Sequence, residues 1–164
     1  MKKLLFIFAL VIGTGFFQTN QAQTKVQEKS TKSSEKIFIQ RADECLELIE
    51  QASQKISIQG VAVIAFIPGN VSVSWISKMK VVGNLTSGKA NLLGSAYTKA
   101  SEMADTHRDS GSGVREIYSG ELGYQGGLIK KVNSGYILAV FSGGSGEQDL
   151  EVAKIGLDWL AKYF

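Results

Sequence analysis

The stretch YILAVFSGGSGEQD, at residues 136–149, decides the fold of this chain. Its first part, residues 136–141, is an unbroken apolar run, which predicts a buried strand. The glycine-rich segment at residues 142–146 predicts a tight turn. Ser145 and Gln148 then have the spacing of a capping box, which predicts that a helix starts here. A strand that turns directly into a helix indicates a domain with both α and β structure.

Three segments have apolar residues at spacings of three and four, the pattern of an amphipathic helix. They cover residues 36–56, residues 89–107 and the C-terminal segment after residue 146. The apolar face of the first consists of Phe38, Ala42, Cys45, Ile49, Ala52 and Ile56. Because Cys45 lies on this face, we expect it to be a small core residue and not a reactive thiol.

Two pairs of strands are expected between these helices. Residues 61–67 form a continuous apolar run, and residues 71–76 alternate polar and apolar after the turn signal Pro-Gly-Asn at residues 68–70. Residues 126–132 and the run at 136–141 flank a second turn, Asn-Ser-Gly. Each pair is expected to form an antiparallel hairpin.

Residues 77–88 and 114–125 show neither period and are expected to be loops. The predicted order is therefore helix, hairpin, helix, hairpin, helix. This order predicts an α/β fold of the α+β kind, with a central antiparallel sheet flanked by helices.

The N-terminus has the layout of a secretory signal peptide. Lys2 and Lys3 precede an apolar run at residues 4–12, and the small residue Ala22 offers a cleavage site. An uncleaved membrane anchor is the alternative, but the run is shorter than the ~20 residues that span a bilayer. We therefore expect residues 1–22 to be a signal peptide, and the mature protein to be secreted or periplasmic, with no stable insertion in a membrane.

Residues 23–35 are polar and are expected to be a flexible linker, so that residues 36–164 form one domain. The net charge of the whole chain is +3. Removal of residues 1–22 takes away two lysines and no acid, so +3 becomes +1. A charge this small does not indicate a nucleic-acid partner. One Cys and one His exclude a disulfide framework and a closed tetrahedral zinc site.

Few residues are candidates for chemistry. His107, the single imidazole, is a candidate metal or haem-iron ligand; alternatively it interacts with the last carbonyl groups of its helix. Met79 is a candidate soft ligand or a packing residue. The neighbouring Lys78 and Lys80 could meet the carboxylates of a ligand or face water.

The turn between the last strand and the last helix is a candidate anion site, because free N–H groups at a helix N-terminus bind phosphate or carboxylate. Its candidate residues are Gly143, Gly144, Ser145 and Gly146. The alternative is a tight turn that needs glycine for its backbone conformation. No nucleophile-elbow motif is present, so a hydrolase is set aside.

Several motifs together resemble the GlcG/HbpS-like family, also called haem-degrading domain or DUF336 proteins. The motifs are Gly126-Gly127, the stretch at residues 136–149, Val152-Ala153, Gly156-Leu157, Lys99-Ala100 and Lys78-Met79, where Arg-Met is usual. The resemblance extends over residues 36–164. The sequence departs from the family where an Arg-Met-Asp becomes Lys78-Met79-Lys80, which replaces an acid by a base.

The resemblance implies a profilin-like fold, homo-oligomers and, in several members, haem binding. It makes an exported protein that binds haem or a related tetrapyrrole the first expectation, with His107 or Met79 as axial ligand and Lys78 and Lys80 near the propionates. An enzyme that degrades haem or modifies a small acid is the second. Because acidic groups of the family's usual pattern are missing, such as the Asp that Lys80 replaces, catalysis is the weaker expectation. A structural subunit of an oligomer, without a small ligand, is the third.

Overall fold

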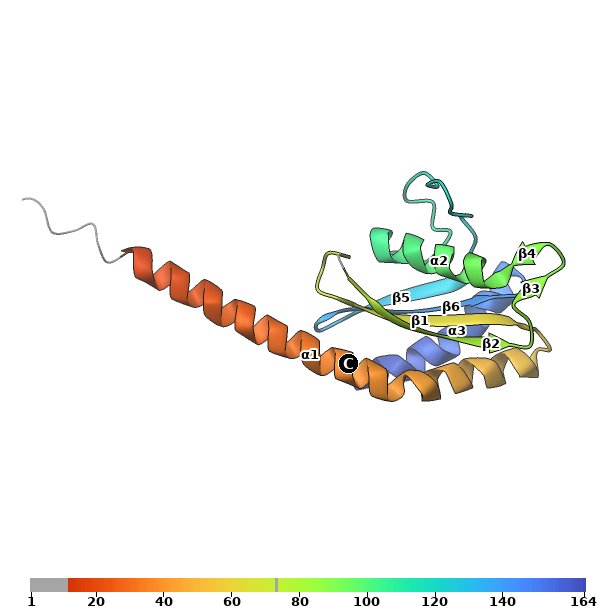
Figure 1. The fold of residues 1–164 in the computed structure, drawn as a ribbon, viewed down its shortest axis with the longest axis horizontal. Helices are drawn as coiled ribbons and strands as arrows, with labels where there is room; N and C mark the ends of the chain where they lie inside the picture. Colours follow the sequence, from red (N-terminus) through yellow and green to blue (C-terminus); the bar gives the residue numbers. More distant parts are fainter. Residues whose placement is uncertain (1–11, 73) are drawn as a thin grey trace, which may run out of the picture.

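A four-stranded antiparallel sheet forms the centre of the molecule (Figure 1). The computed structural model describes residues 12–72 and 74–164, with side chains from residue 23 onward except those of residues 27 and 73. The strands are β1 (Gly60–Pro68), β2 (Ile76–Val82), β5 (Gly127–Val132) and β6 (Gly135–Ser142), in the order β2-β1-β6-β5.

The two central strands are covered on both faces. β1 and β6 pair from Val61↔Ser142 to Pro68↔Gly135. Because successive side chains point to opposite faces of a strand, β1 divides its apolar run between two cores. Ala62, Ile64 and Phe66 lie in one core, and Val61, Val63, Ala65 and Ile67 lie in the other.

Helices cover each face of the sheet (Figure 1). α1 (Ile12–Lys55) and α3 (Gly146–Leu160) pack on one face, and α2 (Leu92–Thr106) packs on the other. Together with the order of strands, this arrangement confirms the predicted α+β fold, a central antiparallel sheet flanked by helices.

Side chains and backbone at both ends of α2 define its length. The Asn91 side chain accepts a hydrogen bond from Gly94 N at 2.9 Å, which caps the helix start. Asn91 belongs to a short ribbon of β3 (Thr86–Ser87) and β4 (Ala90–Asn91). At the other end, His107 adopts the left-handed conformation, with φ +52°, and its N–H bonds to Met103 O.

The second strand is displaced from its predicted position. The alternation at residues 71–76 predicted it there, and residues 77–88 were expected to be a loop. In the structure β2 is Ile76–Val82. The reason is burial: Val82 and Ile76 contribute to a core, whereas Val71 is 67% exposed.

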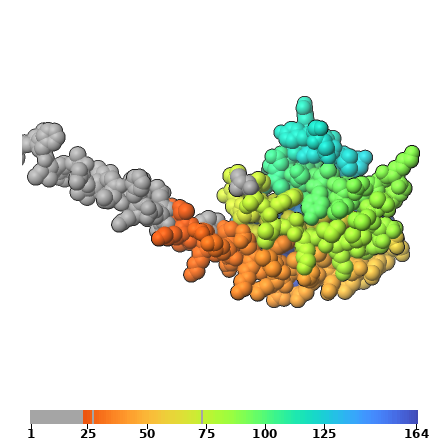
Figure 2. Space-filling model, viewed as in Figure 1, coloured from red at the N-terminus to blue at the C-terminus, as the bar shows by residue number. Residues whose placement is uncertain are grey.

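The segment expected to be a flexible linker, residues 23–35, is helical and continues into the rest of α1. It contains no glycine or proline, and Lys32 and Glu28 form an i,i+4 ion pair at 2.6 Å, which favours helix. This part of α1 projects from the domain (Figures 1 and 2). Residues 1–11 of the expected signal peptide lie outside the described residues. Within the described part, no helix combines the length and apolar character needed to cross a membrane.

Candidate functional site

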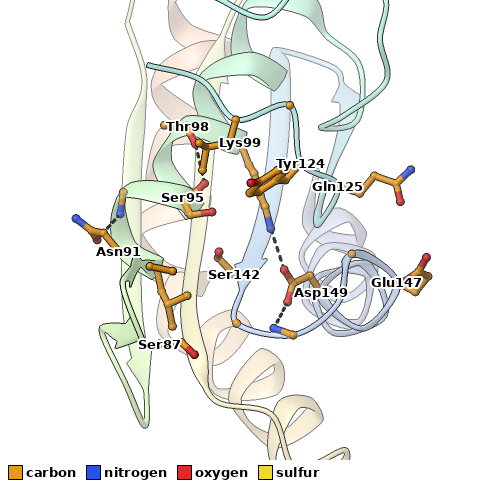
Figure 3. A pocket seen from close by; sticks show the side chains of 18 of the residues that line it. Ser87, Asn91, Ser95, Thr98, Lys99, Tyr124, Gln125, Ser142, Glu147 and Asp149 are labelled. Atoms are coloured by element: carbon orange, nitrogen blue, oxygen red, sulfur yellow. Dashed lines mark hydrogen bonds and ion pairs between the residues drawn. The ribbon is translucent and has the colours of Figure 1, made fainter. Parts of the chain in front are cut away.

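A cavity of about 880 Å³ lies between the first half of α2, the loop before β5 and the turn after β6 (Figure 3). We call it the α2 pocket. Its polar lining includes Ser87, Asn91, Ser95, Thr98, Lys99, Gln125 and Glu147. Leu122 and Tyr124 of the loop contribute an apolar and an aromatic side chain.

The deepest polar group of this pocket is a buried ion pair between α2 and α3. Lys99 and Asp149 are each only 3% exposed. Lys99 Nζ donates to Asp149 Oδ2 at 2.8 Å and to Phe141 O at 2.9 Å (Figure 3). An ammonium group has three N–H donors. The third has no partner among the residues that the structure describes, and Lys99 is part of the pocket wall.

Asp149 connects the ion pair to the glycine-rich turn. Its Oδ1 accepts a hydrogen bond from Gly144 N at 2.8 Å. Burial raises the pKa of Asp149, whereas the Lys99 ammonium and the N–H of Gly144 act in the opposite direction. Gly126 leaves room for the pair: a Cβ there would overlap Lys99 Nζ, and its φ is +130°. The pair therefore holds α2, β6 and the start of α3 in one arrangement around the pocket.

The turn expected to bind an anion lines the pocket, but two of its N–H groups, and that of Gln148 in the first turn of α3, are already used. Gly144 N donates to Asp149, Ser145 N to Gln148 Oε1 at 2.9 Å, and Gln148 N to Ser145 Oγ at 3.3 Å. The last two bonds form the predicted capping box. Gly143 has a steric role, because a Cβ there would overlap the backbone of Gln59. These contacts favour the alternative reading of the turn, a structural one.

An ion-pair cluster holds the loop that forms the outer wall. Both guanidinium Nη atoms of Arg115 donate to the carboxylate of Glu121 at 2.8 Å, and its Nε donates to Asp105 at 2.7 Å. The Arg115 hydrogen bonds, followed by that from Tyr118 N, lower the pKa of Glu121 to about 2. Arg115 also lies over the ring of Tyr118, 3.8 Å from its centroid. The loop is thus held together by its own side chains beside the pocket.

The predicted pair of lysines lies elsewhere, on β2. Lys78 Nζ contacts Asp43 Oδ1 at 2.6 Å, and Lys80 forms an ion pair with Glu50. Both acids belong to α1. Met79 points to the opposite face and packs against the core under α2. The structure therefore does not bring these three residues together with the glycine-rich turn.

His107 lies at the far end of α2. The pocket is lined by α2 residues from Leu92 to Lys99, so the axial distance from His107 is about 22 Å to Leu92 and about 12 Å to Lys99. The imidazole stacks on Tyr136, with ring centroids 4.0 Å apart, and its Nε2 is 3.5 Å from Ser72 Oγ. Among the described residues, no three His, Cys, Asp or Glu side chains cluster as a metal site would require.

Comparisons with known proteins bear on the fold. No family model and no curated protein matches the chain. The structure is similar to that of the protein Ybr137w, with a TM-score of 0.50 and 16% sequence identity. The aligned region covers 82% of this chain and 87% of Ybr137w. It also matches the Klebsiella pneumoniae protein ORFY, whose description names the family DUF336, with a TM-score of 0.48 and 15% sequence identity. The aligned region covers 73% of this chain and 86% of ORFY. The likeness is one of fold.

Lys99 was not among the site residues predicted from the sequence, although a signal for it exists. It lies three residues after Ala96 and four before Met103, both fully buried. A lysine in that position is on the buried face of the helix, where a charge needs a partner. No sequence pattern places Tyr124 at this pocket, because its position depends on the path of an irregular loop.

Proposed function

We propose that this protein binds a small organic molecule in the α2 pocket, and that Lys99 donates its third N–H to an oxygen atom of that ligand. The observation that carries the proposal is the buried ammonium group with an unused donor in the wall of a cavity. A volume of about 880 Å³ is in the usual range of small-molecule sites. The role is binding, since both charges of the buried pair are engaged with each other.

The lining indicates the kind of ligand. A carbonyl, carboxylate or hydroxyl oxygen can accept from Lys99, while Ser95 and Thr98 offer further hydroxyl groups. Leu122 and Tyr124 can cover an apolar part of the molecule. The ligand is therefore a small compound with at least one acceptor oxygen and an apolar portion.

Haem is the ligand that the family resemblance suggests, and the lining of the α2 pocket does not fit it well. No His, Met or Cys is among the described residues that line the pocket, which leaves the phenol of Tyr124 as a candidate iron ligand of a known type. Haem binding therefore stays a prediction that requires its own test.

A ligand screen tests the proposal. We expect a set of small carboxylic acids and ketones to contain compounds that raise the melting temperature of the protein. Tyr124→Ala should weaken binding of such a compound at least threefold, because it removes part of the wall. Val114→Ala is the control, since Val114 is 57% exposed on the same segment, does not line the pocket and has no part in the Arg115 cluster. Equal effects of the two variants would contradict the assignment.

A hemin titration of the mature protein tests the haem prediction separately. A saturable Soret shift near one equivalent per chain would support it, and loss of that shift in His107→Ala would place the iron at His107, outside the α2 pocket. Without a saturable shift, haem is rejected, while the proposed pocket is judged by the screen above.

We also infer that the chain is exported and that residues 1–22 are removed. Support comes from the charged start, the apolar run and the small residue before the expected cut. Intact mass of the protein recovered from its cell envelope or medium should correspond to a chain that starts at Gln23. A mass that includes Met1 would contradict cleavage.

Homo-oligomers, which the resemblance implies, are tested by light scattering of the same material.

A further inference from the structure

A second cavity, of about 690 Å³, lies on the other side of the glycine-rich turn. It is bounded by the end of α1, the end of β2 and the start of α3, and we call it the α1 pocket. It shares Ser87, Leu92, Gly143 and Gly144 with the α2 pocket, but the other lining residues of the two cavities differ.

Four carboxamide side chains line the α1 pocket: Gln54, Gln59, Asn84 and Gln148. Three of their polar groups are used by the protein, since Gln59 Oε1 accepts from Asn84 Nδ2 at 2.6 Å and Gln148 Oε1 accepts from Ser145 N. The amino groups of Gln59 and Gln148, the carbonyl of Asn84 and the whole amide of Gln54 have no hydrogen-bond partner among the described residues. The pocket therefore offers donors and acceptors side by side.

Charge in this pocket is small. The ionisable residue in its described lining is Glu50, which forms an ion pair with Lys80. No cation is left in the lining to hold an anionic ligand, and the carboxylate of Glu50 would repel one. A cationic ligand would have to compete with Lys80. The chemistry of the lining favours an uncharged molecule.

We propose that the α1 pocket binds a neutral, hydroxyl-rich molecule of the carbohydrate class. A hydroxyl group both donates and accepts, so a row of hydroxyls matches a row of free carboxamides. Ile58, whose side chain is partly exposed, supplies apolar surface for the C–H face of a sugar ring. This site is separate from the one under the proposed function and does not depend on it.

Saturation-transfer NMR on the full folded chain, with maltose, cellobiose and N,N′-diacetylchitobiose as probes, tests the site. We expect transfer to at least one disaccharide, and we expect that succinate, which is charged and has no hydroxyl group, does not displace the bound sugar. Gln54→Ala and Asn84→Ala should each raise the Kd about 3- to 10-fold, the effect of losing one or two hydrogen bonds. Gln51→Ala is the matched control, an exposed glutamine one turn away on α1 that does not line the pocket.

Three results would overturn the proposal: no transfer to any of the disaccharides, displacement of the bound sugar by succinate, or equal effects of Gln51→Ala and Gln54→Ala. Tyr124→Ala separates the two sites, because Tyr124 lines the α2 pocket only. Sugar binding that depends on Tyr124 and not on Gln54 would place the sugar in the α2 pocket and would also reject the proposal. Circular dichroism of each variant confirms that it is folded.

Discussion

Lys99 is the residue that links the packing of the fold to the chemistry of the α2 pocket. Its ammonium group bonds to Asp149 and to the carbonyl of Phe141, so α2, α3 and β6 meet at one atom. Taking two charges out of water is costly, and the cost is offset only while both partners are present. The buried pair therefore sets the geometry of the pocket more than it adds net stability.

A double-mutant cycle with Lys99→Met and Asp149→Asn tests this coupling. Each single substitution leaves an unpaired polar group in a buried position, so each should lower the free energy of unfolding by about 3–5 kcal/mol. The double variant should lose less than the sum of the two, by at least ~1 kcal/mol. Urea unfolding measures all four proteins. Strictly additive losses would show that the two side chains act independently.

At the scale of elements, α1 and α3 approach each other closely through Gly156. A Cβ at this position would overlap Ile49 and would lie 3.1 Å from Cys45 Sγ, which itself donates to Gly156 O at 3.3 Å. Burial raises the pKa of Cys45 to about 12, in agreement with the expected inert core residue.

Gly156→Ala should therefore destabilise the protein, although alanine is the better helix former. We expect a loss of about 1–3 kcal/mol in the free energy of unfolding from overpacking. Adding Ile49→Val, which removes a methyl group from the contact, should recover part of the loss. Urea unfolding distinguishes this result from the gain of up to ~1 kcal/mol that helix propensity alone would give.

The loop before β5 should loosen in acid, because its ion-pair cluster depends on a charged Glu121. The pKa of Glu121 is lowered from its ordinary value of 4.5 to about 2, so its ionised form stabilises the folded state above pH ~4.5. This contribution is lost as the pH falls from about 4.5 through about 2. The melting temperature of the wild type should therefore fall more steeply in this window than that of Glu121→Gln. Parallel curves for the two proteins would contradict the role of the cluster.

The sequence predicts most elements because their signals are local. The run at residues 136–141, the capping box of α3 and the apolar face of α1 all depend on periodicity or on short spacings. β2 was misplaced because residues 71–76 alternate more clearly than residues 76–82 do, whereas burial against α1 decides where the strand forms. Residues 23–35, expected to be a linker, are helical in the structure, since polar composition alone does not exclude a helix. The α2 pocket depends on which distant residues meet, and so on contacts that no local pattern contains.

At the scale of the whole molecule, the N-terminal part of α1 stands apart from the domain (Figure 1). Ser34, whose hydroxyl bonds to that of Ser134 at 2.5 Å, and the buried Phe38 attach α1 to the domain. Val26 by contrast is 70% exposed. The first half of α1 therefore contributes little to the stability of the fold.

Two truncations test this view. Removal of residues 1–29 should change the free energy of unfolding by less than ~0.5 kcal/mol, the range of substitutions on an exposed surface. Removal of residues 1–38, which also takes away Ser34 and Phe38, should cost at least about 3 kcal/mol, because a large core side chain is lost. Equal stability of the two shortened chains would mean that the domain begins later than we describe.

The central claim is that a ligand binds in the α2 pocket, beside the buried Lys99–Asp149 pair. Amide chemical-shift mapping with a compound from the ligand screen tests it most directly, because it locates the bound molecule. We predict that the perturbed amides cluster at Ser95, Lys99, Tyr124 and Gly144, which surround the pocket. Perturbations that cluster instead around His107 and Tyr136, at the opposite end of α2, would contradict the claim.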